Sequence, residues 1–150
     1  MKMRCLVLSL ALGCAVGSVG WAIDSIKTSK GLLYGEVVGM DSVKVDLQKT
    51  AGSALQHVPV NEIQTIFYQG ESPNLKIAKN HVLGGHYAEA VAALERIKDE
   101  PDRPEVQQDI EFYKALCAAR LAMAGNMKIG EAGRKMKEFA DTNAKSYHYF

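Results

Sequence analysis

The feature that most constrains this 150-residue chain is the stretch of residues 74–97, which reads NLKIAKNHVLGGHYAEAVAALERI. On both sides of Gly84-Gly85, apolar residues recur at spacings of three and four. This is the period of an amphipathic helix, and a glycine pair permits the backbone conformations that end one. Two helices of similar length joined by a short loop become antiparallel neighbours. The stretch therefore predicts a helical hairpin.

A second, looser hairpin is predicted after the first. Apolar positions keep a helical spacing from Pro104 to Leu121, Gly125-Asn126 is a turn signal, and a further helix is expected from about residue 128 to Phe139. Upstream, Ser72-Pro73 is a good helix start, because serine can cap a helix and proline already has a helical φ. We expect residues 73–150 to form one helical region.

The first hairpin also carries a family resemblance. Gly85-His86-Tyr87-Ala88-Glu89-Ala90-Val91, with Ala78 before it and Leu94 and Ile97 after it, resembles a tetratricopeptide repeat. No tryptophan opens the first helix, and Pro101 only approximates the closing proline of that family. The equivalent alanines of the two hairpins, Ala90 and Ala132, lie 42 residues apart, whereas the family repeats at about 34 residues. A general array of helical hairpins is the alternative.

The resemblance implies a stacked helical surface that binds extended segments or helices of protein partners. It places the inner face on the first helix of each hairpin. The candidate partner-binding residues are Lys76, Lys79, Asn80, Glu111, Lys114 and Arg120.

Residues 23–70 predict a small β module. Short runs rich in Val, Ile and Tyr indicate strands. The clearest run, residues 43–47, alternates apolar and polar side chains, as expected of a strand with one face in the core and the other in water. The runs cover residues 26–28, 32–40, 43–47, 56–60 and 63–68. Five strands at this spacing predict a closed or nearly closed antiparallel barrel. The fold class expected for the whole chain is α+β with the two parts segregated.

The order of these strands resembles that of the SH3-like and Sm-like small barrels. The resemblance is carried by residues 31–38, then residues 43–45, then residues 57–63 followed by Ile66. Kinship with Sm-like barrels would imply RNA binding. The chain has 18 basic and 17 acidic residues and no basic block, so we do not expect nucleic acid as a partner.

The amino terminus has the pattern of a secretory signal peptide over residues 1–22. Lys2 and Arg4 precede an uncharged run to Val19, and Ala22 ends a plausible cleavage site. A membrane-spanning helix is one alternative, but it needs about 20 apolar residues. Lipidation at Cys14, within a sequence resembling a lipobox, is another. We expect export to the periplasm or cell envelope, with membrane contact only if the segment is uncleaved or lipidated at Cys14.

No residue pattern indicates a reaction. His81, His86 and Glu89 superficially resemble metal ligands, but the glycine pair lies between the histidines. Cys117, among alanines, is expected in the core. We therefore predict no catalytic residue, no metal and no cofactor.

Three functions remain open. The leading one is an exported protein-protein interaction or scaffold module that uses the helical surface. The alternative is a barrel-centred binder of cell-wall peptide or glycan, for which exposed Tyr34, Phe67 and Tyr68 would be examined first. An enzyme is the least expected. The aromatic residues 147–150 would open a third hairpin, so the chain is either a fragment or docks these residues elsewhere.

Overall fold

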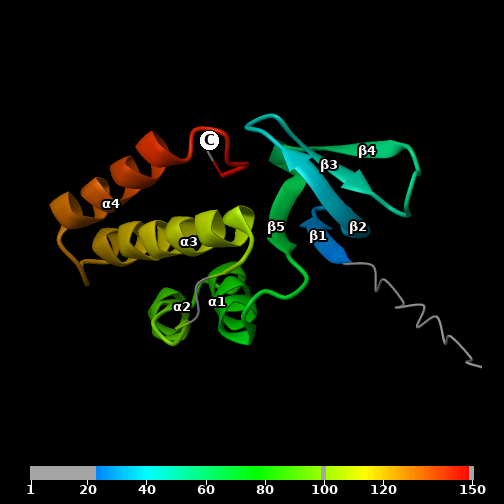
Figure 1. Ribbon diagram of the computed structural model, residues 1–150. Helices are drawn as coiled ribbons and strands as arrows, with labels where there is room; N and C mark the ends of the chain where they lie inside the picture. Colours follow the sequence, from blue (N-terminus) through cyan, green and yellow to red (C-terminus); the bar gives the residue numbers. More distant parts are fainter. Residues whose placement is uncertain (1–22, 99–100, 149–150) are drawn as a thin grey trace, which may run out of the picture.

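The computed structural model describes residues 23–98 and 101–148 of the chain (Figure 1). The predicted signal peptide therefore lies outside the described residues. An antiparallel sheet is followed by a layer of helices, which confirms the segregated α+β class. The strands are β1 (Asp24–Thr28), β2 (Gly31–Met40), β3 (Lys44–Gln48), β4 (Leu55–Pro59) and β5 (Ile63–Phe67), with the short helix η1 (Val60–Glu62) before β5. The helices are α1 (Pro73–Leu83), α2 (Tyr87–Leu94), α3 (Pro104–Met123) and α4 (Ile129–Thr142).

The sheet has the order β4-β3-β2-β1-β5, and every neighbouring pair is antiparallel. β4 and β5 are its two edges and do not pair, so the prediction of a closed barrel is wrong. The helices occupy the β5 side instead. Lys79 Nζ lies 2.6 Å from Ile66 O, and Thr65 Oγ1 lies 2.8 Å from Tyr113 OH. Helical side chains thus bond to one backbone carbonyl and one side chain of β5, the edge strand that a closed barrel would have paired with β4.

Gly35 stands where β2 passes from one partner strand to the other. Residues 31–35 of β2 pair with β1, and pairing with β3 begins at Glu36. A Cβ atom at Gly35 would lie 2.6 Å from Gln48 O. A strand glycine marks such a close approach of two backbones.

We expect Gly35→Ala to destabilise the fold by about 1–3 kcal/mol, because the methyl group would push β3 away from β2. Urea denaturation followed by circular dichroism measures the loss. Gly133→Ala is the matched control: a Cβ there meets nothing within 4 Å, and alanine in a helix should add about 0.5–1 kcal/mol. Equal stabilities for the two variants would contradict this account of Gly35.

The two layers share one hydrophobic core. Buried side chains of the sheet, such as Ile26 and Leu47, belong to the same cluster as Leu75, Leu94 and Ile110 of the helices. The sheet and the helices therefore stabilise one another, although they occupy separate stretches of sequence, predicted as 23–70 and 73–150. Among the described residues, no helix is both long and apolar enough to cross a membrane.

The helical layer contains the predicted hairpins. Ser72 caps α1 by accepting a hydrogen bond from Asn74 N, and Gly85, at φ +78°, makes the turn into α2 that favours glycine. α3 lies between α4 and the α1–α2 pair (Figure 1). This central place of α3 positions the surface described next.

Candidate functional site

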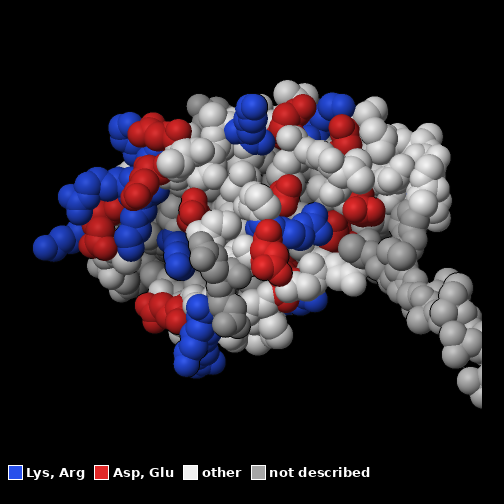
Figure 2. Space-filling model, in the orientation of Figure 1, with Lys and Arg blue, Asp and Glu red and all other residues white. Residues whose placement is uncertain are grey.

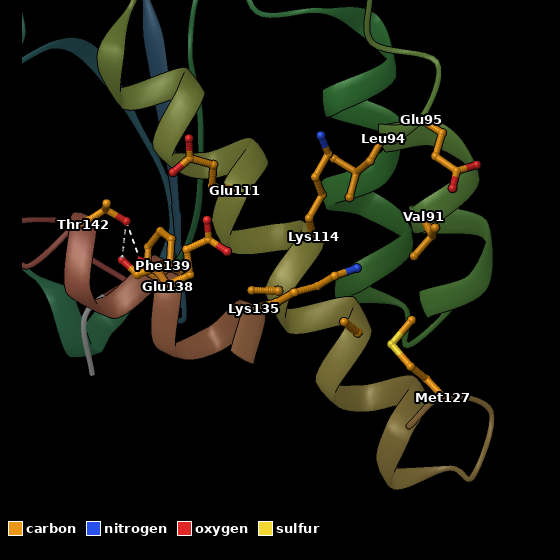
Figure 3. Close-up of a pocket in the computed structure, with 12 residues that line it drawn as sticks. Val91, Leu94, Glu95, Glu111, Lys114, Met127, Lys135, Glu138, Phe139 and Thr142 are labelled. Carbon is orange, nitrogen blue, oxygen red and sulfur yellow. Dashed lines mark hydrogen bonds between the residues drawn. The ribbon is translucent and has the colours of Figure 1, made fainter. Parts of the chain in front are cut away.

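A groove runs over α3, with α2 on one side and α4 on the other (Figure 3). Its volume is about 520 Å³. Small or apolar side chains form its floor and walls: Val91, Leu94, Ala115, Ala118, Met127 and Phe139. Polar side chains surround them: Glu95, Glu111, Lys114, Lys135, Glu138 and Thr142. An apolar centre surrounded by polar and charged residues is typical of protein-binding surfaces.

The charges of the groove are unevenly placed. Figure 3 shows Glu95 and Glu111 toward one end and Met127 at the other, with Lys114 and Lys135 between them. Glu111 accepts hydrogen bonds from Gln107 Nε2 at 2.9 Å and from Asn143 Nδ2 at 3.1 Å. Lys135 Nζ lies 3.6 Å from Glu131 Oε1 on its own helix. Three carboxylates against two ammonium groups give the lining a slight excess of negative charge.

The surrounding surface carries charges of both signs. On the face shown in Figure 2, lysine and arginine side chains gather over the end formed by α3 and α4 and are interspersed with acidic ones. Such mixing does not produce the single-sign field that attracts a polyanion.

The predicted partner-binding residues separate into three groups. Glu111 and Lys114 line the groove together. Lys76, Asn80 and Arg120 are exposed but do not line it; the Arg120 guanidinium lies 5.9 Å from the centre of the Tyr87 ring. Lys79 is wholly buried, with 0% of its surface exposed, so its prediction as a partner contact is wrong.

Burial of Lys79 follows from its place on α1. It falls one turn after Leu75 and next to Ala78, on the helix face that packs inward. Its charge is balanced by two buried carboxylates: Glu71 Oε2 lies 2.5 Å and Asp109 Oδ2 lies 2.7 Å from its Nζ atom. The Asp109 contact is an ion pair without hydrogen-bond geometry.

His148 completes this charge cluster, which we define as Glu71, Lys79, Asp109 and His148. His148 Nε2 lies 2.8 Å from Asp109 Oδ1. Burial would raise the pKa of Asp109, but Lys79 and His148 together outweigh it and lower that pKa. Burial raises the pKa of Glu71, and the attraction of Lys79 offsets only part of the increase. None of these four groups lines the groove.

Several groove residues escaped sequence prediction. Lys135, Glu138, Phe139 and Thr142 share one face of α4 by their spacing of three and four. From that spacing, the sequence alone could have placed these four residues on one face of a helix. Ala115 and Ala118 fall within the helix expected from Pro104 to Leu121, but nothing local in the sequence shows which alanines of a helix will line a groove.

The other residues considered from the sequence are Cys117, Tyr34 and Tyr68, and the first and last of these are buried. Cys117 is buried, and burial raises its pKa to about 11, which leaves little thiolate at neutral pH. Tyr34 is exposed as expected, at 58%. Tyr68, also proposed as exposed, is 1% exposed, and its ring packs 4.8 Å from the Arg103 guanidinium.

One of the aromatic residues after α4 packs into the fold. Tyr147 is buried, at 5% exposure, and belongs to the main core. Tyr147 therefore docks on the rest of the fold. Residues 149–150 lie outside the described residues.

No protein-family model, curated protein or solved structure matched this chain.

Proposed function

We propose that this chain is an exported protein-binding module of the cell envelope, and that the groove over α3 receives an amphipathic helix of a protein partner. The groove, with its apolar floor and charged border, is the observation that carries the proposal. Export rests on the signal-peptide pattern of residues 1–22. The tetratricopeptide-like sequence of the first hairpin points to the same class of function.

The shape of the groove favours a helix as the occupant. Ala115 and Ala118 are three residues apart on α3, so they follow one another on the same helix face. Both are only 2% exposed, and Ala118 packs in one cluster with Ala132 of α4, so these small side chains leave the space above α3 open. Val91 of α2 and Met127 before α4 line the groove and are partly exposed, so they would contact the apolar stripe of that helix.

The charge of the lining specifies the occupant further. Glu95, Glu111 and Glu138 outnumber Lys114 and Lys135, so a partner helix with basic residues beside its apolar stripe is complementary. Charges at the border of an interface mainly set the association rate and the choice of partner. The apolar contacts on the floor supply most of the affinity.

Site-specific photo-crosslinking in the intact envelope tests the proposal. A benzoylphenylalanine placed at Lys114 should crosslink to a partner segment with helical apolar periodicity, mapped by mass spectrometry. The same probe at Tyr34, on the outer face of the sheet, should give no such product. Crosslinks from both positions, or to a segment without that periodicity, would contradict a helix-binding groove.

The mapped segment then becomes a synthetic peptide for titration. Val91→Asp should weaken its binding by tenfold or more, which is about 1.4 kcal/mol, because the new carboxylate would be buried in the apolar contact. Lys49→Glu, in the exposed turn after β3, should bind the peptide like the wild type. Far-ultraviolet circular dichroism checks that both variants keep their helices.

A second candidate, a binder of cell-wall peptide or glycan centred on the sheet, is favoured by one observation. Leu32, Tyr34 and Val38 of β2 and Leu55 of β4 are exposed, and large exposed apolar side chains often mark binding surfaces. The crosslinking experiment separates the two candidates, since this one requires products from Tyr34 and none from Lys114.

A further inference from the structure

Residues 143–148, which we call the C-terminal latch, return from the end of α4 onto α3. Figure 1 shows this segment between the helices and the sheet. Asn143 Nδ2 donates to Glu111 Oε2 at 3.1 Å and to Phe139 O at 3.2 Å. Ser146 is fully buried, and the side chain of His148 is only 7% exposed. The latch is therefore packed into the fold.

His148 anchors the latch through two contacts. Its Nε2 atom lies 2.8 Å from Asp109 Oδ1, and its ring stacks on Phe112 with a centroid distance of 3.6 Å and an interplanar angle of 9°. Tyr113 meets the same ring edge-on at 5.6 Å. Burial against an apolar ring costs a hydrogen-bonded neutral imidazole little, whereas a charged one loses much more hydration there.

The charged and titratable groups around His148 come from several elements. They are Asp109 and Tyr113 of α3, Lys79 of α1, Glu71 before α1, and Tyr147 of the latch itself. With His148 neutral, Lys79 faces two carboxylates. Burial lowers the pKa of His148, and the hydrogen bond and charge of Asp109 offset only part of that effect. The fold therefore favours the neutral ring.

His148 is expected to make the folded state less stable in acid. Because the folded pKa of His148 lies below the unfolded value of 6.5, the stability it contributes is present above pH 6.5 and is lost as the pH falls toward the folded pKa. Glu71 acts in the opposite sense. Its pKa is raised from 4.5, so its proton uptake favours the folded state at lower pH. A variant at His148 is needed to separate the two.

The latch and the groove share residues. Glu111, which bonds to Asn143, also lines the groove, as does Phe139. The Phe139 ring lies 5.5 Å from Phe112, the ring on which His148 stacks. Loosening of the latch would therefore free the end of α4 that forms one wall of the groove.

We propose that the C-terminal latch is an acid-sensitive device that holds the end of α4 against α3 while His148 is neutral, and releases it on protonation, thereby changing the shape of the groove. This inference rests on the proposed function for its biological meaning. The regulated site is the helix-binding groove, and the signal is the pH outside the cytoplasm.

Amide exchange of the intact protein, followed by nuclear magnetic resonance, tests the latch without any partner. Ser146 N donates to Asn143 O, and Asn143 N donates to Phe139 O, each at 2.9 Å. After correction for intrinsic rates, protection of both amides should fall about tenfold per pH unit below pH 6.5, since opening takes up one proton. His148→Gln, with an uncharged amide in place of the ring, should remove this dependence. His57→Gln, at an exposed strand position, should leave it unchanged.

Titration of the His148 ring in the wild type supplies a measurement that needs no variant to fold. The midpoint of its chemical-shift titration should fall at the pH where amide protection stops decreasing, because both report the pKa of His148 in the folded state. Unchanged protection between pH 7.5 and 5.5, or an equal loss in His148→Gln, would overturn the latch. Loss at Ser146 with Asn143 still protected would overturn its link to α4 and the groove. Failure to crosslink from Lys114 would refute the proposed function alone, since these amide readings do not depend on a partner.

Discussion

Replacing Lys79 by methionine is expected to destabilise the protein by about 3–5 kcal/mol, the usual cost of leaving a buried charge without its partner. Methionine fills a similar volume but leaves Glu71 and Asp109 close together with no cation between them. Ile66 O also loses the donor that covers the β5 edge. Urea denaturation at pH 7.5 measures the change.

Two further variants test the cause. Lys76→Met, at an exposed position on the same helix, should change stability by less than about 0.5 kcal/mol. Adding Glu71→Gln and Asp109→Asn to Lys79→Met should recover part of the loss, because the triple variant contains no unpaired charge. If the single Lys79 variant were as stable as the Lys76 one, the cluster would not be the buried ion network described above.

The second large effect is expected at Asp24, whose carboxylate joins the first strand to the helical layer. Asp24 Oδ2 accepts from Val37 N at 2.9 Å, and Oδ1 accepts from Gln69 N at 2.8 Å. Arg103 Nη1 donates to Oδ1 at 3.0 Å and to Oδ2 at 3.2 Å. Asp24 is fully buried. Asp24→Ala should cost about 3–5 kcal/mol, because two backbone donors and a guanidinium lose their acceptor at once.

A double-mutant cycle with Arg103→Ala separates the ion pair from the backbone contacts. We expect a coupling energy of about 1–3 kcal/mol between Asp24 and Arg103. Asp24→Asn, which keeps one carbonyl acceptor, should be less harmful than Asp24→Ala. Independent, additive losses in the cycle would show that Arg103 acts through its stack on Tyr68 and not through Asp24.

The helical hairpins were predictable because their signals are local. Apolar residues at spacings of three and four, the capping serine before Pro73 and the glycine pair act on the backbone within a few residues. The alternation of residues 43–47 likewise marked β3. Such signals depend only on neighbouring residues, so they can be interpreted without knowing which helices or strands pack against the segment.

The errors arose where a distant element decides the outcome. Lys79 has the composition of a surface residue, and its burial depends on carboxylates contributed by a loop and by α3. Barrel closure failed because helices took the β5 edge, which the strand pattern does not encode. Only Glu111 and Lys114 of the predicted surface reached the groove, since the groove depends on how α2 and α4 flank α3. Export and the tetratricopeptide relationship remain predictions.

The distances in sequence between partners at the core have a kinetic consequence. β1 lies inside the sheet and needs β5 on one side, Asp24 bonds to Arg103 79 residues later, and Asp109 bonds to His148 39 residues later. Contacts between residues far apart in sequence slow folding, because the loops they close must be ordered first. Because the ribosome adds about 5–20 residues per second, the growing chain cannot complete this core until His148 has been synthesised. Such a delay would suit a polypeptide that crosses a membrane before it folds.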